Sequence, residues 1–177
     1  MTFKLNFKNG TINFPIKSIN LIKLFSEIEN DFDTNEPIEL LLFTKEEFEP
    51  IISLCEAVNF EKLKLPKPLF IKKTLVKQEI NKNENLKIFF ENLNLKEISS
   101  LINLADYLQF ELLEDLIYFK IYQEKIFNFN VDCISNDNKD FNKEENLKIY
   151  EKYFNYCENC VKHLNEKDVN EFFYIIS

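Results

Sequence analysis

The feature that most constrains the fold is a strongly apolar stretch over residues 98–126. In its first half, apolar residues recur at three- and four-residue spacing, as on one face of an amphipathic helix: Ile98, Leu101, Ile102, Ala105 and Leu108. From Leu112 onward the apolar residues leave no wide polar side. A helix that is apolar all round must be covered on more than one side. The stretch therefore predicts a core helix and then a second helix, which is covered by this chain or by another protein.

The charge and the composition argue against several classes of function. The 177-residue chain has a net charge of -8, which argues against nucleic acid or an anionic membrane as its main ligand. Because the sequence contains no arginine, it lacks the bidentate fork that usually holds phosphate. The single glycine, Gly10, rules out glycine-rich phosphate loops and a G-x-S-x-G nucleophile turn. We therefore expect neither a P-loop nucleotide site nor a hydrolase with a G-x-S-x-G nucleophile.

The sequence gives no sign of membrane insertion or secretion. Its apolar runs are shorter than a membrane span, and residues 1–10 lack a signal-peptide core. We therefore interpret the four cysteines as reduced thiols: Cys55, Cys133, Cys157 and Cys160. These observations predict a cytoplasmic or nuclear protein of one domain, or of one domain with an appendage.

The N-terminal part of the chain predicts a small sheet and a helix. Residues 3–14 alternate apolar and polar residues on both sides of Asn9–Gly10, a pattern that predicts a β-hairpin. Residues 18–25 predict a helix with Ser18 as its N-cap. Residues 37–43 predict a short buried strand that is entered through a proline.

The middle of the chain begins with a helix signal and then loses its periodicity. The spacing of Thr44 and Glu47 predicts a capping box at the start of a helix. Pro50 either delays the start of that helix or kinks it. Residues 60–85 contain two prolines and clustered lysines without a sustained period, so they predict a long loop. Regular structure is expected to return at residues 86–90.

The C-terminal part predicts a hinge and one more helix. Asn94 is expected to cap the core helix, and the Asn- and Asp-rich residues 128–139 predict a hinge. Residues 142–164 predict a long helix whose apolar residues cover roughly half of its circumference, more than one packing contact needs. Residues 168–177 are expected to fold back or to form a sticky end.

Several short segments resemble a known fold by their order and spacing. Residues 18–25, 37–40, 51–55 (IISLC) and 104–115 (LADYLQFELLED) resemble the BTB/POZ fold. Residues 140–145 (DFNKEE) and 156–158 (YCE) resemble the tail of the SKP (S-phase-kinase-associated protein) family within that fold. This family joins F-box proteins to the cullin of SCF ubiquitin ligases. An elongin-C-like adaptor would lack that tail.

The resemblance implies an α+β protein with a BTB/POZ fold, a small sheet with helices packed around it. Residues 1–127 would form the BTB/POZ domain, with a variable loop over residues 60–85. Residues 128–177 would form a C-terminal helical extension that binds F-box proteins. The implied function is that of a non-catalytic adaptor in ubiquitin-dependent protein degradation, without a cofactor or a metal.

The resemblance also implies two contact surfaces. The N-terminal region of a cullin would contact Asp106 and Tyr107. The F-box helices would contact a larger apolar set: Leu116, Ile117, Ile121, Ile126, Phe141, Ile149, Tyr153, Phe154 and Tyr156. The alternative for this set is that its members pack against one another. Buried aromatic anchors supply most of the binding energy in protein–protein interfaces. This favours an F-box surface that contains part of the all-round apolar helix after Leu112 and part of the helix predicted over residues 142–164.

Other interpretations remain open for the same residues. Within binding proteins, the alternative is a BTB/POZ self-association module or a divergent, elongin-C-like adaptor that has lost one partner, with a homodimer as the unpartnered form. A thiol redox protein would use Cys157 and Cys160, and a metal site would add His163 and Cys133. His163 is the single histidine, so a nucleophile has no obvious acid or base partner, and an enzyme is not expected.

Overall fold

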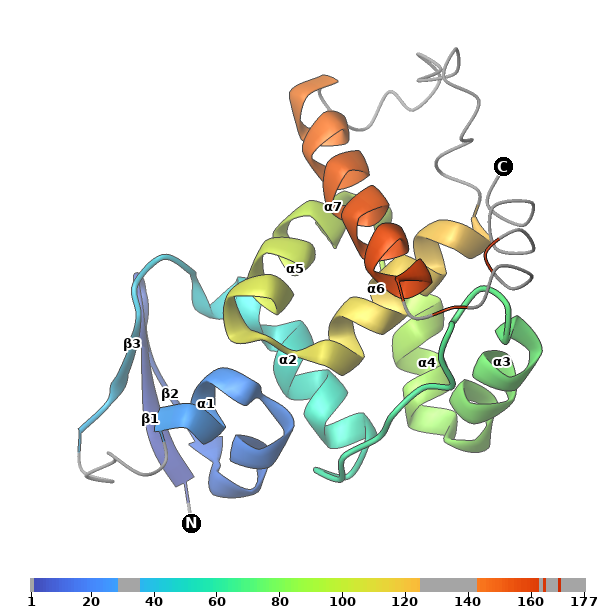
Figure 1. The fold of residues 1–177 in the computed structure, drawn as a ribbon. Helices are drawn as coiled ribbons and strands as arrows, with labels where there is room; N and C mark the ends of the chain where they lie inside the picture. The colour runs from blue at the N-terminus through green and yellow to red at the C-terminus, as the bar shows by residue number, and fades with distance from the viewer. Residues whose placement is uncertain (1, 29–35, 125–142, 163, 165–168, 170–177) are drawn as a thin grey trace.

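The computed structural model of this chain describes residues 2–28, 36–124, 143–162, 164 and 169. Figure 1 shows a small sheet at one end of the described part and helices over the rest. The chain therefore has the mixed α+β class that the sequence predicts. The predicted hinge over residues 128–139 lies outside the described residues, as does all of the predicted tail except Val169.

Three strands form the sheet in the order β2-β1-β3: β1 (Thr2–Phe7), β2 (Gly10–Pro15) and β3 (Ile38–Leu40). The predicted hairpin of β1 and β2 is confirmed, with Lys8 and Asn9 in its turn. β3 pairs parallel to β1, with Leu40 opposite Phe7. The predicted strand over residues 37–43 is wrong in length and burial, because the chain turns away from the sheet at Leu41.

Eight helical segments follow the described chain: η1 (Ile16–Leu21, a 3-10 helix), α1 (Lys23–Ile28), α2 (Lys45–Ala57), α3 (Lys73–Lys82), α4 (Glu84–Asn92), α5 (Leu95–Leu108), α6 (Glu111–Gln123) and α7 (Lys143–Val161). The start of α2 confirms the predicted capping box. The Thr44 side chain accepts from the Glu47 N–H, and the Glu47 carboxylate accepts from the Thr44 N–H at 2.8 Å. Pro50 lies inside α2, so it does not delay the helix.

Two further predictions about local structure are wrong. Ser18 does not cap a helix, because the chain enters η1 directly after Pro15 and encloses Ser18 there without exposure. Residues 60–85 are not one long loop, because α3 lies within them. The helix signal of α3 was weak, since only Val76 and Ile80 of that helix are buried.

A tight turn separates the two halves of the apolar stretch. The N–H of Gln109 donates to the Asp106 carbonyl at 3.1 Å, and the N–H of Phe110 donates to the Ala105 carbonyl at 2.9 Å. These two bonds, with Gln109 at a φ of 53°, form the Schellman end of a helix. The expected division into two helices is therefore confirmed, and the turn sends α6 back through the molecule (Figure 1).

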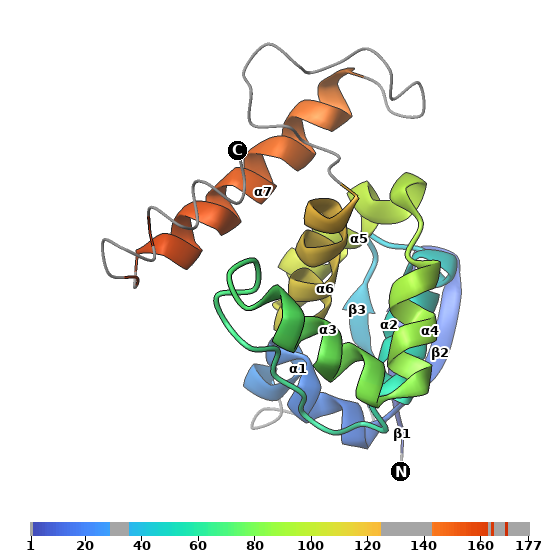
Figure 2. The ribbon, with the colours of Figure 1, turned by 90° about the vertical axis from the view of Figure 1, so that its right-hand side faces the viewer.

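Helix α6 lies at the centre of the helical part, and Figure 1 shows it between α5 and the α3–α4 pair, while Figure 2 shows it in front of α5. Its buried residues lie on all sides: Leu112, Leu113, Asp115, Leu116, Ile117, Tyr118, Phe119 and Ile121. Phe119 contacts Phe90 of α4, with their ring centroids 6.0 Å apart. Tyr118 contacts Tyr156 of α7 with the ring centroids 4.3 Å apart. The cover that the all-round apolar pattern requires is thus supplied by this chain.

Candidate functional site

An exposed apolar patch lies after β3, and we call it the Tyr107 patch: Leu41, Leu42, Phe43 and Tyr107. Leu41 is 57% exposed and Leu42 is 77% exposed, although both are large apolar side chains. The Phe43 backbone is fixed on both sides, since its N–H donates to the Leu40 carbonyl and its carbonyl accepts from the Lys8 N–H, each at 3.0 Å. A rigid backbone that presents neighbouring apolar side chains is typical of a protein contact surface.

Tyr107, a residue of the expected cullin surface, lies at the edge of this patch. Its ring meets that of Phe43 edge to face, with centroids 5.3 Å apart, and 42% of the residue remains exposed. Asp106 is also exposed, and its carboxylate forms an ion pair of 2.7 Å with Lys152 of α7. Exposed ion pairs of this kind contribute little stability, so this contact adds little to the docking of α7.

The α6 residues of the expected F-box surface lie in the core. Leu116 and Ile117 are fully buried, and Ile121 is 1% exposed. Two residues of α7 from the same set, Ile149 and Tyr153, are buried as well. In this structure these five side chains therefore join α6 and α7 to the core, and a partner would reach them only by displacing part of the chain.

The remaining members of that set lie at the boundary of the core or beyond the described part. Tyr156 and Phe154 are half-buried on α7, and the Phe154 ring stacks with that of Tyr150 at a centroid distance of 6.2 Å. Ile126 and Phe141 lie outside the described residues. Of the predicted F-box residues on α7, Tyr156 contacts α6 through both its hydroxyl and its ring.

Tyr156 joins α7 to a buried carboxylate of α6. Its hydroxyl donates to Oδ1 of Asp115 at 2.6 Å, and the Asp115 side chain is only 3% exposed. Lys67 lies 3.2 Å from the same oxygen and 2.7 Å from Oε1 of Glu111. Burial raises the pKa of Asp115, and the nearby Lys67 ammonium and the Tyr156 hydroxyl offset part of this rise. The two carboxylates in turn raise the pKa of Lys67 despite its partial burial.

The sequence reasoning did not identify Lys67 or Asp115 as site residues. The available signal was a single aspartate in a helix that is apolar on every side, because a buried carboxylate requires polar partners. The segment around Lys67 also supplies Phe70 to the contact between α6 and α7. The Phe70 ring lies 4.8 Å from that of Tyr122 and 5.9 Å from that of Tyr153, measured between centroids.

An apolar cavity opens beside the carboxyl end of α7, and we call it the α7 cavity. Its volume is about 410 Å³, and the described residues that line it are Lys67, Pro68, Tyr156, Asn159, Cys160 and Leu164. This volume lies in the usual range for an apolar side chain or ligand to enter. Tyr156 therefore has two roles, because its hydroxyl binds Asp115 while its ring forms part of the cavity wall.

Of the two cysteines of α7, Cys157 is buried and Cys160 is half-buried in the wall of the α7 cavity. Cys157 is 2% exposed, and burial raises the pKa of its thiol to about 12. Burial also raises the pKa of the Cys160 thiol. Thiols with raised pKa values react slowly, which gives the redox interpretation no support. Within the described ranges, histidine, cysteine and acidic side chains form no group of three suited to a metal, and His163 and Cys133 lie outside them.

Comparisons with known proteins give no family assignment. No family model, curated protein or solved structure matches this chain. Among the helices of the described residues, none has both the length and the apolar character needed to cross a membrane.

Proposed function

We propose that this chain is a non-catalytic adaptor with a BTB/POZ fold that joins a cullin to F-box proteins in an SCF-type ubiquitin ligase. The observation that carries the proposal is a pair of apolar surfaces built from different elements, the Tyr107 patch and the α7 cavity. An adaptor needs two such surfaces. The resemblance of the sequence segments to the SKP family supports the same function, and so does the order of hairpin, helix, third strand and helices.

The cullin would bind the Tyr107 patch. Asp106 and Tyr107 come from the resemblance, while Leu41 and Leu42 are added because of their exposure. An apolar core with a polar rim is typical of a protein interface, and the Asp106 carboxylate supplies one polar group at the rim. Leu42 is more exposed than Leu41 and Tyr107, so it would supply the most apolar contact area.

The F-box protein would bind at the α7 cavity, with Tyr156, Cys160 and Leu164 as its apolar wall. Leu116, Ile117, Ile121, Ile149 and Tyr153 would support this surface from below rather than contact the partner directly. An apolar side chain of an F-box helix would enter the cavity, in the manner of a helix that docks into a groove. The proposal therefore moves the contact from the buried side of α7 to its carboxyl end.

Binding of the two partners to purified protein tests the proposal. Leu42→Asp should abolish binding to a cullin N-terminal region and leave F-box binding unchanged. Leu75→Asp is its matched control, since Leu75 is an exposed leucine of α3 (49%) away from both surfaces. Asn159→Arg should block the α7 cavity and abolish binding to an F-box peptide, with cullin binding unchanged. Asn155→Arg, at another exposed position of α7, should affect neither partner.

A wild-type chain that binds neither the cullin region nor the F-box peptide would contradict the proposal. Binding of one partner alone would favour the divergent adaptor, and light scattering separates this from self-association. A stable dimer that is indifferent to added F-box peptide would identify the chain as a BTB/POZ self-association module instead.

A further inference from the structure

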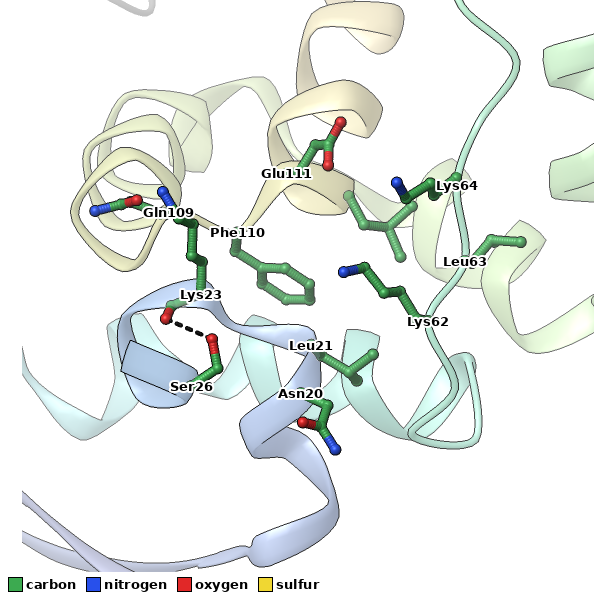
Figure 3. Close-up of a pocket in the computed structure, with 11 residues that line it drawn as sticks. Asn20, Leu21, Lys23, Ser26, Lys62, Leu63, Lys64, Gln109, Phe110 and Glu111 are labelled. Atoms are coloured by element: carbon green, nitrogen blue, oxygen red, sulfur yellow. Dashed lines mark hydrogen bonds between the residues drawn. The ribbon is translucent and has the colours of Figure 1, made fainter. Parts of the chain in front are cut away.

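A second cavity, built from three separate parts of the chain, shares no lining residue with the two apolar surfaces. We call it the lysine cavity after Lys23, Lys62 and Lys64, which line it together with the α5–α6 turn. Its volume is about 160 Å³. Figure 3 shows Lys62 extending from the segment after α2 toward Phe110 and Lys64 extending from the same segment toward Glu111, while Lys23 extends from α1 beside Gln109. Three lysines and one carboxylate, that of Glu111, therefore line one small hollow of an acidic protein.

The chain balances only part of the positive charge around this cavity. Lys23 forms an ion pair of 3.4 Å with Glu27, but both side chains are more than half exposed, so the pair is weak. The carboxylate of Glu111 is held by Lys67 at 2.7 Å. Lys62 and Lys64 form no ion pair with any residue in the described part of the chain, although both lower the pKa of Glu111 through space. Lys62 and Lys64 therefore interact with Glu111 only through space, and an anion in the cavity would lie beside that carboxylate.

The size and the lining of the cavity restrict the anion. A volume of 160 Å³ equals about five water molecules and lies below the usual range for nucleotide-sized ligands. Leu21, Phe110 and Leu112 give the cavity an apolar part that suits the carbon atoms of a side chain. Lysine binds phosphate as a point charge, and a phosphate monoester carries close to two negative charges at neutral pH. The start of α6 lies in the same place, but Glu111 and Glu114 already occupy its first turn, so an anion would depend on the lysines rather than on the helix end.

We propose that the lysine cavity binds a phosphorylated serine or threonine side chain of a partner polypeptide. The phosphate group interacts with Lys62 and Lys64, Lys23 adds a third charge at the edge, and the apolar part contacts the carbon atoms of the phosphorylated side chain. This site is independent of the adaptor function, since neither the Tyr107 patch nor the α7 cavity shares a residue with it.

Fluorescence anisotropy with a labelled alanine-based peptide that has one central phosphoserine tests this proposal. The same peptide with serine or with glutamate at that position and inorganic phosphate as a competitor complete the experiment. The wild-type chain should bind the phosphoserine peptide at least about tenfold more tightly than the other two peptides, and added salt should weaken the binding. Inorganic phosphate should displace the peptide.

A charge-matched pair of variants locates the site. Lys62→Ala with Lys64→Ala should weaken phosphoserine binding by about tenfold or more, since charged hydrogen bonds are lost. Lys73→Ala with Lys77→Ala removes the same charge from exposed positions of α3 and should leave binding unchanged. All four side chains are exposed, so circular dichroism should show an unchanged fold. The proposal is overturned by equal binding of the glutamate or serine peptide, by equal losses in both variant pairs, or by undetectable binding to the wild type.

Discussion

Removal of one hydroxyl from Tyr156 should destabilise the protein measurably. In Tyr156→Phe the ring still contacts Tyr118 and Phe70, so the change removes the 2.6 Å hydrogen bond to Asp115 and leaves the packing in place. Hydrogen bonds to charged groups contribute about 1.5–3 kcal/mol, more than neutral ones. Because the carboxylate is almost fully buried, water cannot replace the lost donor, and we expect a loss of about 2 kcal/mol in the free energy of unfolding.

Urea unfolding followed by circular dichroism measures this loss, and a double-mutant cycle assigns it to one contact. In Asp115→Ala the acceptor is absent, so adding Tyr156→Phe to that variant should cost much less than it costs in the wild-type chain. Lys67 keeps its contact with Glu111 in every member of the cycle. Tyr107→Phe serves as the control, because Tyr107 is 42% exposed and its hydroxyl should be worth less than about 0.5 kcal/mol. A Tyr156→Phe variant as stable as the wild type, or additive effects in the cycle, would refute the reasoning.

Three further predictions concern pH, capping and thiol reactivity. Burial raises the pKa of Asp115 above its ordinary value of 3.8, so the folded protein binds this proton more tightly than the unfolded chain does. The contribution of Asp115 to the free energy of unfolding should therefore be greatest below pH 3.8 and should fall as the pH rises through its pKa in the folded protein. Comparing the unfolding of Asp115→Asn with that of the wild type over this pH range measures the contribution. Thr44→Ala removes the cap that bonds to Glu47 and should cost about 1 kcal/mol, measured by urea unfolding. Cys55 and Cys157, whose pKa values are about 12, should react with iodoacetamide far more slowly in the folded protein than in urea, as peptide mass spectrometry would show.

Structural features that depend on a few neighbouring residues were predicted well from the sequence. The capping box at Thr44 needs contacts only within one helical turn, and the hairpin needs only a tight turn between two alternating segments. The all-round apolar pattern of α6 also gave the correct degree of burial. It did not say whether this chain or a partner supplies the cover, because periodicity does not identify the packing partner.

The errors arise where tertiary contacts decide the structure. The run of Leu41 and Leu42 is indistinguishable from a buried strand in sequence, yet the chain leaves the sheet there and exposes both side chains. Helix α3 was not predicted because only two of its residues, Val76 and Ile80, are buried, too few for a clear helical period. The contact between Lys67 and Asp115 joins segments that are far apart in sequence, so no local spacing predicts it.

The central position of α6 also determines how the molecule opens. Amide protons of a helix enclosed on all sides exchange with solvent only when the whole core unfolds, so exchange in the middle of α6 reports global stability. Helix α7 is held on one side, with Leu147 47% exposed, and should exchange through smaller openings in which it leaves α6. A ligand that binds at the α7 cavity would slow exchange in α7 more than in α6. The ratio of the two rates would then indicate which surface a partner occupies.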